Sequence, residues 1–388
     1  MRTINIIKNR KKIIIISTIL IIFIILLIIL VSLYLSQKNY RNWIDINVFR
    51  KNVSEQDIQS INLNTDKNNQ IHVYNNYISV LNDKTVTLYN SYGEKITSIE
   101  VNINSAIFDS SQKYFAIAEN NGHEICLIFD KTYLWSEKLE GEILQIHVNR
   151  NGYVATISTD ATHKSIVTFF NSQGKKLFTS YFASTRIVDA SISNDNKYIA
   201  IGELDTSGTI IKSNIKVLSV QNAQQDAENT IIYTYEADDG KLITNVKYQE
   251  KNQISCIFDN GLGVIKDETY KDVIKIENDS ITYLANDFNN HVAYVDEEST
   301  GLFKAQSNVH IINTSDFQEK LYKMDYIAKD VYANDNIIAI NVGTEIYFVD
   351  TNGWLIKKYT SNQEITNIKF SEKLATVIFK DRIVIINL

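Results

Sequence analysis

A hairpin-like phrase recurs along most of this 388-residue chain, and this repetition limits its possible folds more than any other feature. The phrase "SISNDNKYIAIG", residues 191–202, joins two apolar runs through a polar tip of Asn, Asp and Lys. Similar phrases begin at residues 107, 146, 246, 284, 331 and 368. Self-similarity with a period of about 40 residues is typical of propellers and solenoids.

A second recurring phrase completes the repeating unit. It reads "YNSYGEKI" at 89, "FNSQGKKL" at 170 and "VDTNGWLI" at 349. An Asn or Asp side chain bonds to backbone two residues on and Gly supplies a positive φ, so the phrase predicts a tight turn between strands. Each unit therefore has two hairpins and four strands, A to D, and the chain is expected to be all-β.

The units predict a ring of four-stranded blades. They begin near residues 70, 103, 143, 187, 242, 280 and 327, and a last unit, 364–388, has only three strands. The segment "DIQSINLN", residues 57–64, precedes the first complete unit and can supply the missing strand. Such a closure removes the free sheet edge. We predict a β-propeller of eight blades, with seven as the alternative.

The N-terminal segment predicts a membrane anchor. Residues 13–35 are almost wholly apolar, long enough as a helix to cross a hydrocarbon core of about 30 Å. A cleavable signal peptide is the alternative, but its apolar region is usually about 7–15 residues and ends in small residues, which "VSLYLSQKNYRNW" does not offer. The expected organisation is a basic N-terminus (1–12), a transmembrane helix (13–35), a linker (36–56) and the propeller (57–388).

Charge predicts the orientation and excludes one class of partner. The span is preceded by five basic residues and closely followed by two: Arg2, Lys8, Arg10, Lys11 and Lys12, then Lys38 and Arg41. The positive-inside bias then keeps the N-terminus cytoplasmic and the propeller extracytoplasmic. Of 39 Lys and Arg, five lie in residues 1–35, so the remainder carries 34 against 45 acidic residues, a net charge of about −11. Such a surface repels phosphate backbones, so no nucleic-acid partner is expected.

Short motifs link these units to known propellers. "SISNDNKYIAIG" resembles the A–B hairpin of WD-repeat-like propellers, and "FNSQGKKLF" and "VDTNGWLIKKY" resemble the C–D turn of quinoprotein-like propellers. The Trp-Asp dipeptide and a regular Trp per blade are missing, and the one Gly-His pair precedes strand C, so no quinone cofactor is implied. The whole chain resembles uncharacterised clostridial-type single-span membrane proteins with an extracytoplasmic propeller.

No catalytic, cofactor-binding or metal-ligating set stands out in the sequence. It contains no nucleophile elbow, phosphate loop or zinc-spaced Cys and His cluster. Cys126 and Cys256 lie 130 residues apart inside apolar runs and are expected to be buried and unbridged. The six histidines are spread over different strands or loops and predict no metal site: His72, His123, His147, His163, His291 and His310.

Acidic loops are the candidate binding feature. In a propeller the B–C and D–A connections open on one face, which would gather the loops "GELDTSG", "EADDG" and "DEESTG". The candidate residues are Glu203, Asp205, Glu236, Asp238, Asp239, Asp296, Glu297 and Glu298. Carboxylates at this density could attract a basic partner or hold calcium weakly. The alternative is a solvated acidic rim.

These features favour a membrane-anchored scaffold that binds a protein or a cell-envelope polymer, without catalysis. The alternative is a carboxylate-dependent hydrolase or lyase of envelope glycans, which needs a carboxylate pair about 5–9.5 Å apart across a cleft. A deep axial pocket with paired carboxylates would favour the enzyme, and a flat or plugged face the scaffold. Twelve residues before the span make a cytoplasmic signalling domain unexpected.

Overall fold

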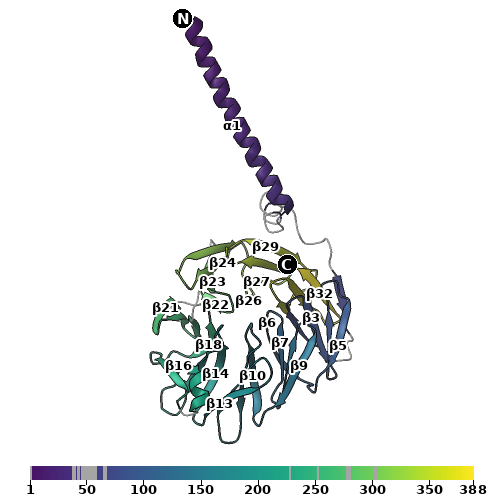
Figure 1. Ribbon diagram of the computed structural model, residues 1–388, viewed down its shortest axis with the longest axis vertical. Coiled ribbons are helices and arrows are strands. Elements are labelled where there is room, and N and C mark those ends of the chain that lie inside the picture. The colour runs from purple at the N-terminus through teal and green to yellow at the C-terminus, as the bar shows by residue number, and fades with distance from the viewer. Residues whose placement is uncertain are drawn as a thin grey trace.

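The strands form an eight-bladed β-propeller (Figure 1). The computed structural model describes residues 2–36, 41, 44, 59–63, 68–226, 229–250, 253–276, 281–299 and 305–388. Within these residues, eight antiparallel four-stranded sheets surround one axis, with the first strand of each unit innermost. The eight blades predicted from the sequence are therefore confirmed.

The first four blades follow one another along the chain. Blade 1 contains β2 (Gln70–Tyr74), β3 (Tyr77–Asn82), β4 (Thr85–Tyr89) and β5 (Lys95–Glu100). Blade 2 contains β6 (Ala106–Ser111), β7 (Tyr114–Glu119), β8 (Glu124–Phe129) and β9 (Thr132–Lys138). Blade 3 contains β10 (Glu142–Val148), β11 (Val154–Thr159), β12 (Ser165–Phe170) and β13 (Lys176–Phe182). Blade 4 contains β14 (Thr185–Ile192), β15 (Tyr198–Asp205), β16 (Lys212–Ser219) and β17 (Ile231–Glu236).

The remaining blades repeat this order until the last. Blade 5 contains β18 (Ile243–Tyr248), β19 (Ile254–Phe258), β20 (Gly261–Lys266) and β21 (Thr269–Lys275). Blade 6 contains β22 (Ile281–Ala285), β23 (His291–Ser299), β24 (Ala305–Asn313) and β25 (Glu319–Met324). Blade 7 contains β26 (Asp330–Asn334), β27 (Ile337–Asn341), β28 (Glu345–Asp350) and β29 (Leu355–Thr360). Blade 8 contains β30 (Ile368–Phe370), β31 (Leu374–Ile378), β32 (Arg382–Asn387) and β1 (Gln59–Asn62).

Strand β1 closes the ring as the fourth strand of blade 8. It pairs antiparallel with β32, and Ile61 lies opposite Ile383. The closure predicted for residues 57–64 is confirmed over Gln59–Asn62; residues 57, 58 and 64 lie outside the described residues. Blade 8 is also joined to blade 1 by the Ser371 hydroxyl, which donates to the Asn75 carbonyl oxygen at 2.6 Å.

The predicted C–D turns have the expected chemistry. In the turn at Asn171, the side-chain Oδ1 accepts backbone N–H bonds from Gln173 and Lys175 at 3.0 and 2.9 Å. Gly174 follows with φ of +81°. Asn90 and Asp350 make the same pair of bonds in their own turns. The Asn or Asp side chain and the Gly conformation together fix these turns.

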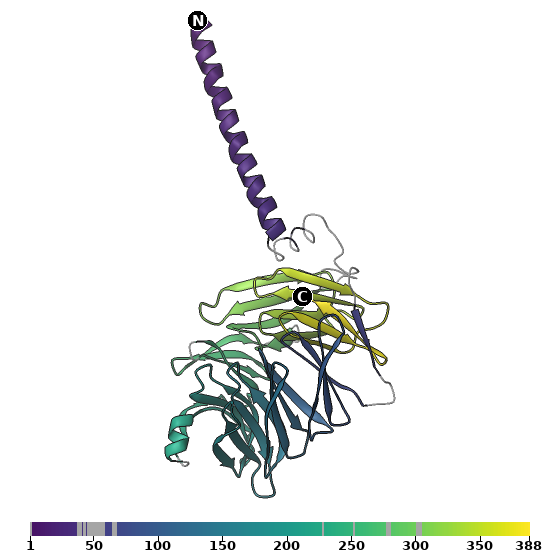
Figure 2. The ribbon, with the colours of Figure 1, turned by 45° about the vertical axis from the view of Figure 1, so that its right-hand side comes forward.

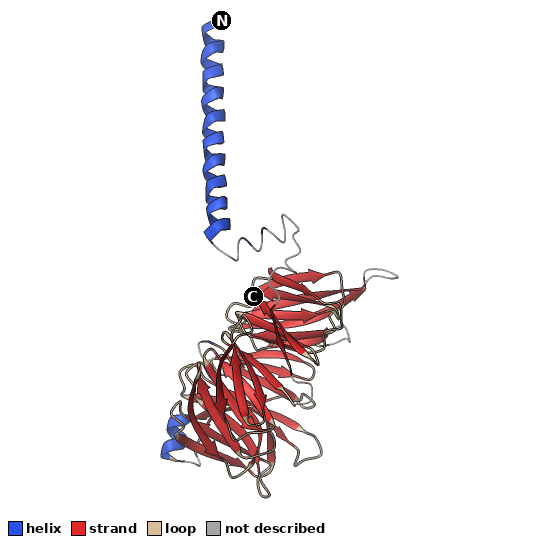
Figure 3. Ribbon diagram, turned by 90° about the vertical axis from the view of Figure 1, so that its right-hand side faces the viewer, coloured by secondary structure: helices blue, strands red, loops and turns tan. Residues whose placement is uncertain are grey.

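The hydrophobic core lies between blades rather than at the centre of the ring. One layer, between blades 8 and 1, joins Ile61, Ile71, Val73, Ile78, Val80, Leu374, Ile383 and Ile385. Other layers pack blade 1 on blade 2 and blade 3 on blade 4. Each sheet buries both faces against its neighbours, and the strands fill almost the whole domain (Figure 3). The residues that line the axis are mostly polar.

Among the described residues, helices α1 and α3 accompany the blades. Helix α1 (Arg2–Ser36) stands apart from the propeller (Figure 2). Its stretch Thr18–Ser36 is long and apolar enough to cross a membrane, and none of it is buried. An anchor and a signal sequence share these properties. The short helix α3 (Val220–Gln225) follows β16, and its first turn is capped by the Ser219 side chain.

Candidate functional site

A cavity of 770 Å³ occupies the axis of the propeller. It is lined by the second halves of inner strands and by the turns that join strands A and B, including Gln112, Arg150, Asn194 and Asn336. Because these turns all lie on one face, the cavity opens there. That face is opposite the B–C and D–A connections, where the sequence analysis placed its acidic candidates.

Side chains of one blade satisfy the open edge of the next inner strand. The innermost strand of each sheet has backbone groups facing the axis, and buried backbone groups need partners. Val148 N–H in β10 donates to Asp109 Oδ2 in β6 at 2.6 Å. Val246 N–H in β18 donates to Asp189 Oδ2 in β14 at 2.8 Å. The polar residues of the inner strands thus hold neighbouring blades together around the cavity.

Both carboxyls hold their protons more tightly than a free aspartate. Burial raises the pKa of Asp109 to about 6, although Lys247 and two backbone N–H bonds partly offset it. Burial raises the pKa of Asp189 to about 7, and Asp287 adds to this shift. Carboxyl groups with such values near neutrality are suited to proton transfer or to binding a cation.

The two inner histidines of blades 1 and 3 are neutral near pH 7. Burial, with Lys369, lowers the pKa of His72 to about 3. Burial, with Lys247, lowers the pKa of His147 to about 4. His72 Nε2 lies 2.9 Å from the Ser110 hydroxyl, and His147 Nε2 lies 3.5 Å from Asp189 Oδ1. These rings therefore add hydrogen-bonding groups to the cavity but no positive charge.

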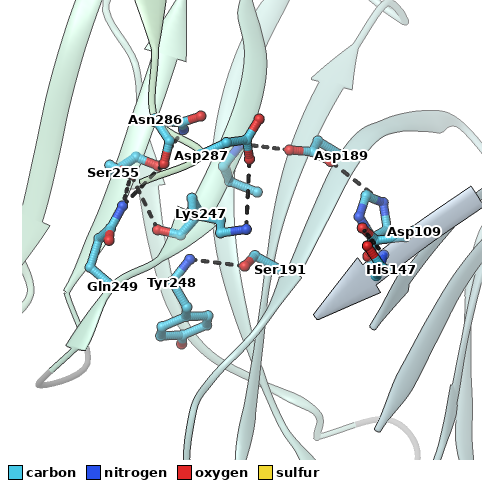
Figure 4. Close-up of polar contacts among 12 residues, drawn as sticks. Asp109, His147, Asp189, Ser191, Lys247, Tyr248, Gln249, Ser255, Asn286 and Asp287 are labelled. Atoms are coloured by element: carbon cyan, nitrogen blue, oxygen red, sulfur yellow. Dashed lines mark hydrogen bonds and ion pairs between the residues drawn. The ribbon is translucent and has the colours of Figure 1, made fainter. Parts of the chain in front are cut away.

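Lys247 lines the cavity, and its ammonium group points toward Asp287 (Figure 4). Its Nζ lies 3.6 Å from Asp287 Oδ1, and the two side chains are 41% and 57% exposed, so water and solutes can reach them. Burial opposes the charge, but Asp287, Asp109, Asp335 and Asp189 outweigh it and raise the pKa of Lys247. Lys247 is thus a cation at neutral pH, among four acidic side chains from blades 2, 4 and 7 and from the segment after β22.

Glu203, one of the acidic residues predicted to lie in a loop, instead forms a buried ion pair within a sheet. Glu203 lies in β15 and is 1% exposed. Its carboxylate contacts Lys216 Nζ at 2.6 Å and accepts hydrogen bonds from Thr185 and Asn214 at 2.7 and 3.0 Å. Strand β15 continues through "GELD" to Asp205 because each of these residues pairs with both β14 and β16. This carboxylate is already saturated by its own sheet.

The other candidates lie toward the face that was predicted, in varied settings. Asp205 bonds to Ser207 N–H, and Asp238 pairs with Lys241 at 3.2 Å, whereas Glu236 and Asp239 are exposed. Asp296, Glu297 and Glu298 lie within β23 rather than in a loop. Asp296 is 3.5 Å from His310, and Glu298 accepts from Gln306 at 2.8 Å. That this face binds a ligand stays a prediction.

Cysteine and histidine placement agrees with the sequence only in part. Cys126 and Cys256 are buried and free, as predicted. Three of the six histidines, His72, His147 and His291, line one cavity, although nothing in their spacing indicated that they would meet. Among the residues that the structure describes, no group of three His, Cys, Asp or Glu side chains is arranged to hold a metal ion.

The axial residues were missed because their signal lies inside the repeat itself. Each A-strand phrase carries a polar residue just before its hairpin, as in "IHVY", "IFDS", "IHVN", "VKYQ" and "IKFS". Aligning the repeats would have gathered His72, Asp109, His147, Lys247 and Lys369 at one level of the inner strands. Loop composition alone could not reveal this, because the charges are spread singly over the blades.

Comparisons with known proteins agree with this fold. Residues 49–388 match DUF5711, described as a family of unknown function. No curated protein sequence matches the chain. The crystal structure of BamB from Moraxella catarrhalis is 12% identical with a TM-score of 0.50, over 85% of this chain and 98% of that chain. The C-terminal WD40 domain of Sif2 is 11% identical with a TM-score of 0.56, over 85% and 99%. At such low identities these likenesses show the fold alone.

Proposed function

Because this chain belongs to DUF5711, a family of unknown function, we propose its function from its own residues. It is a membrane-anchored, extracytoplasmic β-propeller that acts as an interaction scaffold for a protein or a cell-envelope polymer. Residues 1–12 are the cytoplasmic N-terminus, 13–35 the anchor, 36–56 the linker and 57–388 the propeller.

The exposed apolar surface of α1 carries this proposal. From Ile19 to Val31 every residue is exposed, with large side chains such as Phe23 and Ile28 both 61% exposed. An apolar surface of this extent is unfavourable in water, and a lipid bilayer is the environment that matches it. The segment also lacks the small-residue cleavage site of a signal peptide. We therefore infer that α1 anchors the propeller to a membrane.

The orientation rests on the basic residues before the span. Lys8, Arg10, Lys11 and Lys12 favour a cytoplasmic N-terminus. Protease added to intact, wall-stripped cells that make the full chain should degrade the propeller and leave cytoplasmic proteins whole. Replacing the four basic residues by Glu should reduce correct insertion. A propeller protected from protease in the wild-type chain would overturn the proposed orientation.

The propeller has an open axial cavity rather than the flat or plugged face expected of a scaffold, so the scaffold role rests on the anchor and on a rigid ring whose cavity can admit a partner's segment. Chemical cross-linking in cells, followed by purification of the full chain, should recover a specific envelope component. The matched control is a chain carrying only α1 and the linker, which has the same membrane location. Equal recovery with both chains would contradict a role for the propeller.

A second candidate is the carboxylate-dependent hydrolase or lyase of envelope glycans. The observation that favours it is Asp189, whose pKa of about 7 would let the carboxyl act as a general acid at the cavity wall. Glycan cleavage by the purified full chain, lost in Asp189→Asn and kept in Asp239→Asn, would establish it. Absence of any cleavage would leave the scaffold.

A further inference from the structure

We propose that the axial cavity binds the primary ammonium group of a partner molecule, such as a lysine side chain or a polyamine. This deepens the proposed function and rests on it, because it names the chemistry that the scaffold recognises. The cavity volume of 770 Å³ falls within the range of about 300–1,000 Å³ that is usual for ligand sites.

The charges that line the cavity do not balance. Five acidic residues, Asp109, Asp189, Glu250, Asp287 and Asp335, face three basic ones, Arg150, Lys247 and Lys369. His72 and His147 add no positive charge near neutral pH, because burial lowers the pKa of each. Even with Asp189 partly protonated near pH 7, as its raised pKa implies, the cavity has more carboxylates than cations, and this charge favours a cationic ligand over an anion.

The ion pair of Lys247 shows that the cavity can hold an ammonium group, and other acidic groups in the cavity have no such partner. Lys247 forms its ion pair with Asp287, at 3.6 Å. Among the described residues, Asp109, Asp189 and Asp335 have no ion pair with a lysine or arginine. Carboxylate repulsion contributes at Asp189, since Asp287 raises its pKa. A second ammonium beside Asp189 would relieve this repulsion without displacing Lys247.

A separate unsatisfied acceptor lines the same cavity. Asn245 Oδ1, two residues before Lys247, is shielded from solvent and accepts no hydrogen bond in the part of the chain that the structure describes. A shielded acceptor without a donor costs roughly 1–3 kcal/mol. An ammonium group carries three N–H donors and no acceptor. An ammonium ligand thus supplies the donors that this acceptor and the carboxylates of the cavity can use, whereas an anion supplies none.

The geometry favours an organic ammonium over a metal ion. A bound divalent ion needs several oxygen ligands within about 2.0–2.6 Å, and no described group of three acidic, His or Cys side chains is arranged to supply them. The carboxylates come from separate blades, so they offer a diffuse negative field instead. The mouth is rich in amides, including Asn194, Asn289 and Asn290, which can bond to a peptide backbone or a polyhydroxylated chain that carries the ammonium.

Calorimetry with the purified full chain in detergent tests this inference. The probes are the blocked peptide Gly-Lys-Gly, its acetyl-lysine counterpart and spermidine. The lysine peptide or spermidine should bind, and acetylation should abolish peptide binding because it removes the charge. Binding of the peptide alone identifies a polypeptide source, and binding of spermidine alone a free polyamine. The inference is overturned if neither binds or if the acetylated peptide binds equally well.

Variants place the binding in the cavity. Asp189→Asn with Asp335→Asn should weaken binding at least tenfold, while the amide oxygen introduced at position 189 would still accept the Val246 N–H bond. Asp239→Asn removes an exposed carboxylate on the opposite face and should leave the affinity unchanged. Lys247→Gln should strengthen binding, since it removes a competing cation, and a folding defect cannot mimic a gain. Wild-type affinity in both cavity variants would refute the site. Because purified protein is used, a wrong membrane orientation would not affect this result.

Discussion

At the scale of single residues, the buried carboxylate of Glu203 is bound by side chains of its own sheet and is not free to bind a ligand. Glu203 was predicted as a loop group from the acidic composition of "GELDTSG", but β15 continues to Asp205 between β14 and β16, so Glu203 is buried within the sheet. Composition could not show this, because the end of a strand is set by pairing with its neighbours. The exposure of Asp239, in contrast, followed from its place in a Gly-containing polar loop.

Glu203→Ala should lower the free energy of unfolding by about 3–5 kcal/mol, because it leaves Lys216 as an uncompensated buried charge. Lys216 is only 20% exposed, so water cannot replace the lost partner fully. Urea unfolding of the full chain followed by tryptophan fluorescence measures the change. Asp239→Ala is the matched control and should change stability by less than about 0.5 kcal/mol. Equal effects of the two variants would contradict the structural role.

The inner histidine of blade 1 should make the propeller less stable in acid. His72 has a folded pKa of about 3, against 6.5 when unfolded. The unfolded chain therefore binds more protons between these values, so the stability contribution is lost as pH falls from 6.5 toward 3. In His72→Gln the melting temperature should fall less over this range than in the wild-type chain. An unchanged pH profile would contradict it.

Asp189 should change the stability with the opposite sign over a largely overlapping pH range. Its pKa rises from 3.8 to about 7 on folding, so the folded chain binds more protons between these values. This group therefore destabilises the propeller increasingly as pH rises from about 4 to 7. Asp189→Asn should remove that decline, so its melting temperature should exceed that of the wild-type chain most at pH 7 and above. A larger advantage at pH 4 would reverse the sign and refute the assignment.

At the scale of the element, the sequence predicted the C–D turns well because their chemistry is local. An Asn or Asp followed three residues later by Gly is enough to specify the turn, whatever surrounds it. What local chemistry could not predict is the neighbour. Gly174 packs on Trp135 of blade 2, where an added Cβ would lie 2.8 Å from the ring. This turn is therefore also a contact between blades.

Gly174→Ala should destabilise the chain more than Gly240→Ala does. Both glycines have a positive φ, +81° and +87°, but nothing lies within 4 Å of a Cβ at Gly240. Gly240→Ala should cost only the backbone strain, about 1–2 kcal/mol. Gly174→Ala should add about 1–3 kcal/mol from the clash with Trp135. Thermal unfolding of both variants gives the difference, and equal losses would show that the inter-blade contact yields without cost.

For the whole molecule, counting repeats was sufficient to predict eight blades and their closure, whereas the cavity escaped prediction. The ring follows from the period and from one orphan strand, both of which are visible in the sequence. The cavity depends on where eight inner strands converge and on which side chains of one blade reach the next. His72, Asp109 and Lys247 are far apart in the chain and meet only through that convergence.

Closure of the ring by β1 should contribute a large part of its stability. Ile61 is 6% exposed and packs with Ile383 and Ile385, and the adjacent Ser60 is exposed on the same strand. Ile61→Asp removes an apolar contact worth about 1.5–3 kcal/mol and would bury a charge without a partner. This loss is a large fraction of the roughly 5–15 kcal/mol by which folded domains are stable.

In the full chain, Ile61→Asp should therefore lower the melting temperature by many degrees, and Ser60→Asp should leave it nearly unchanged. Detachment of β1 also exposes the backbone edge of β32, which can pair with a second chain. Light scattering on the detergent-solubilised protein should then show oligomers for Ile61→Asp alone. If both variants have the same melting temperature and stay monomeric, the pairing of β1 with β32 does not hold the ring closed. The last blade must then be stable with three strands.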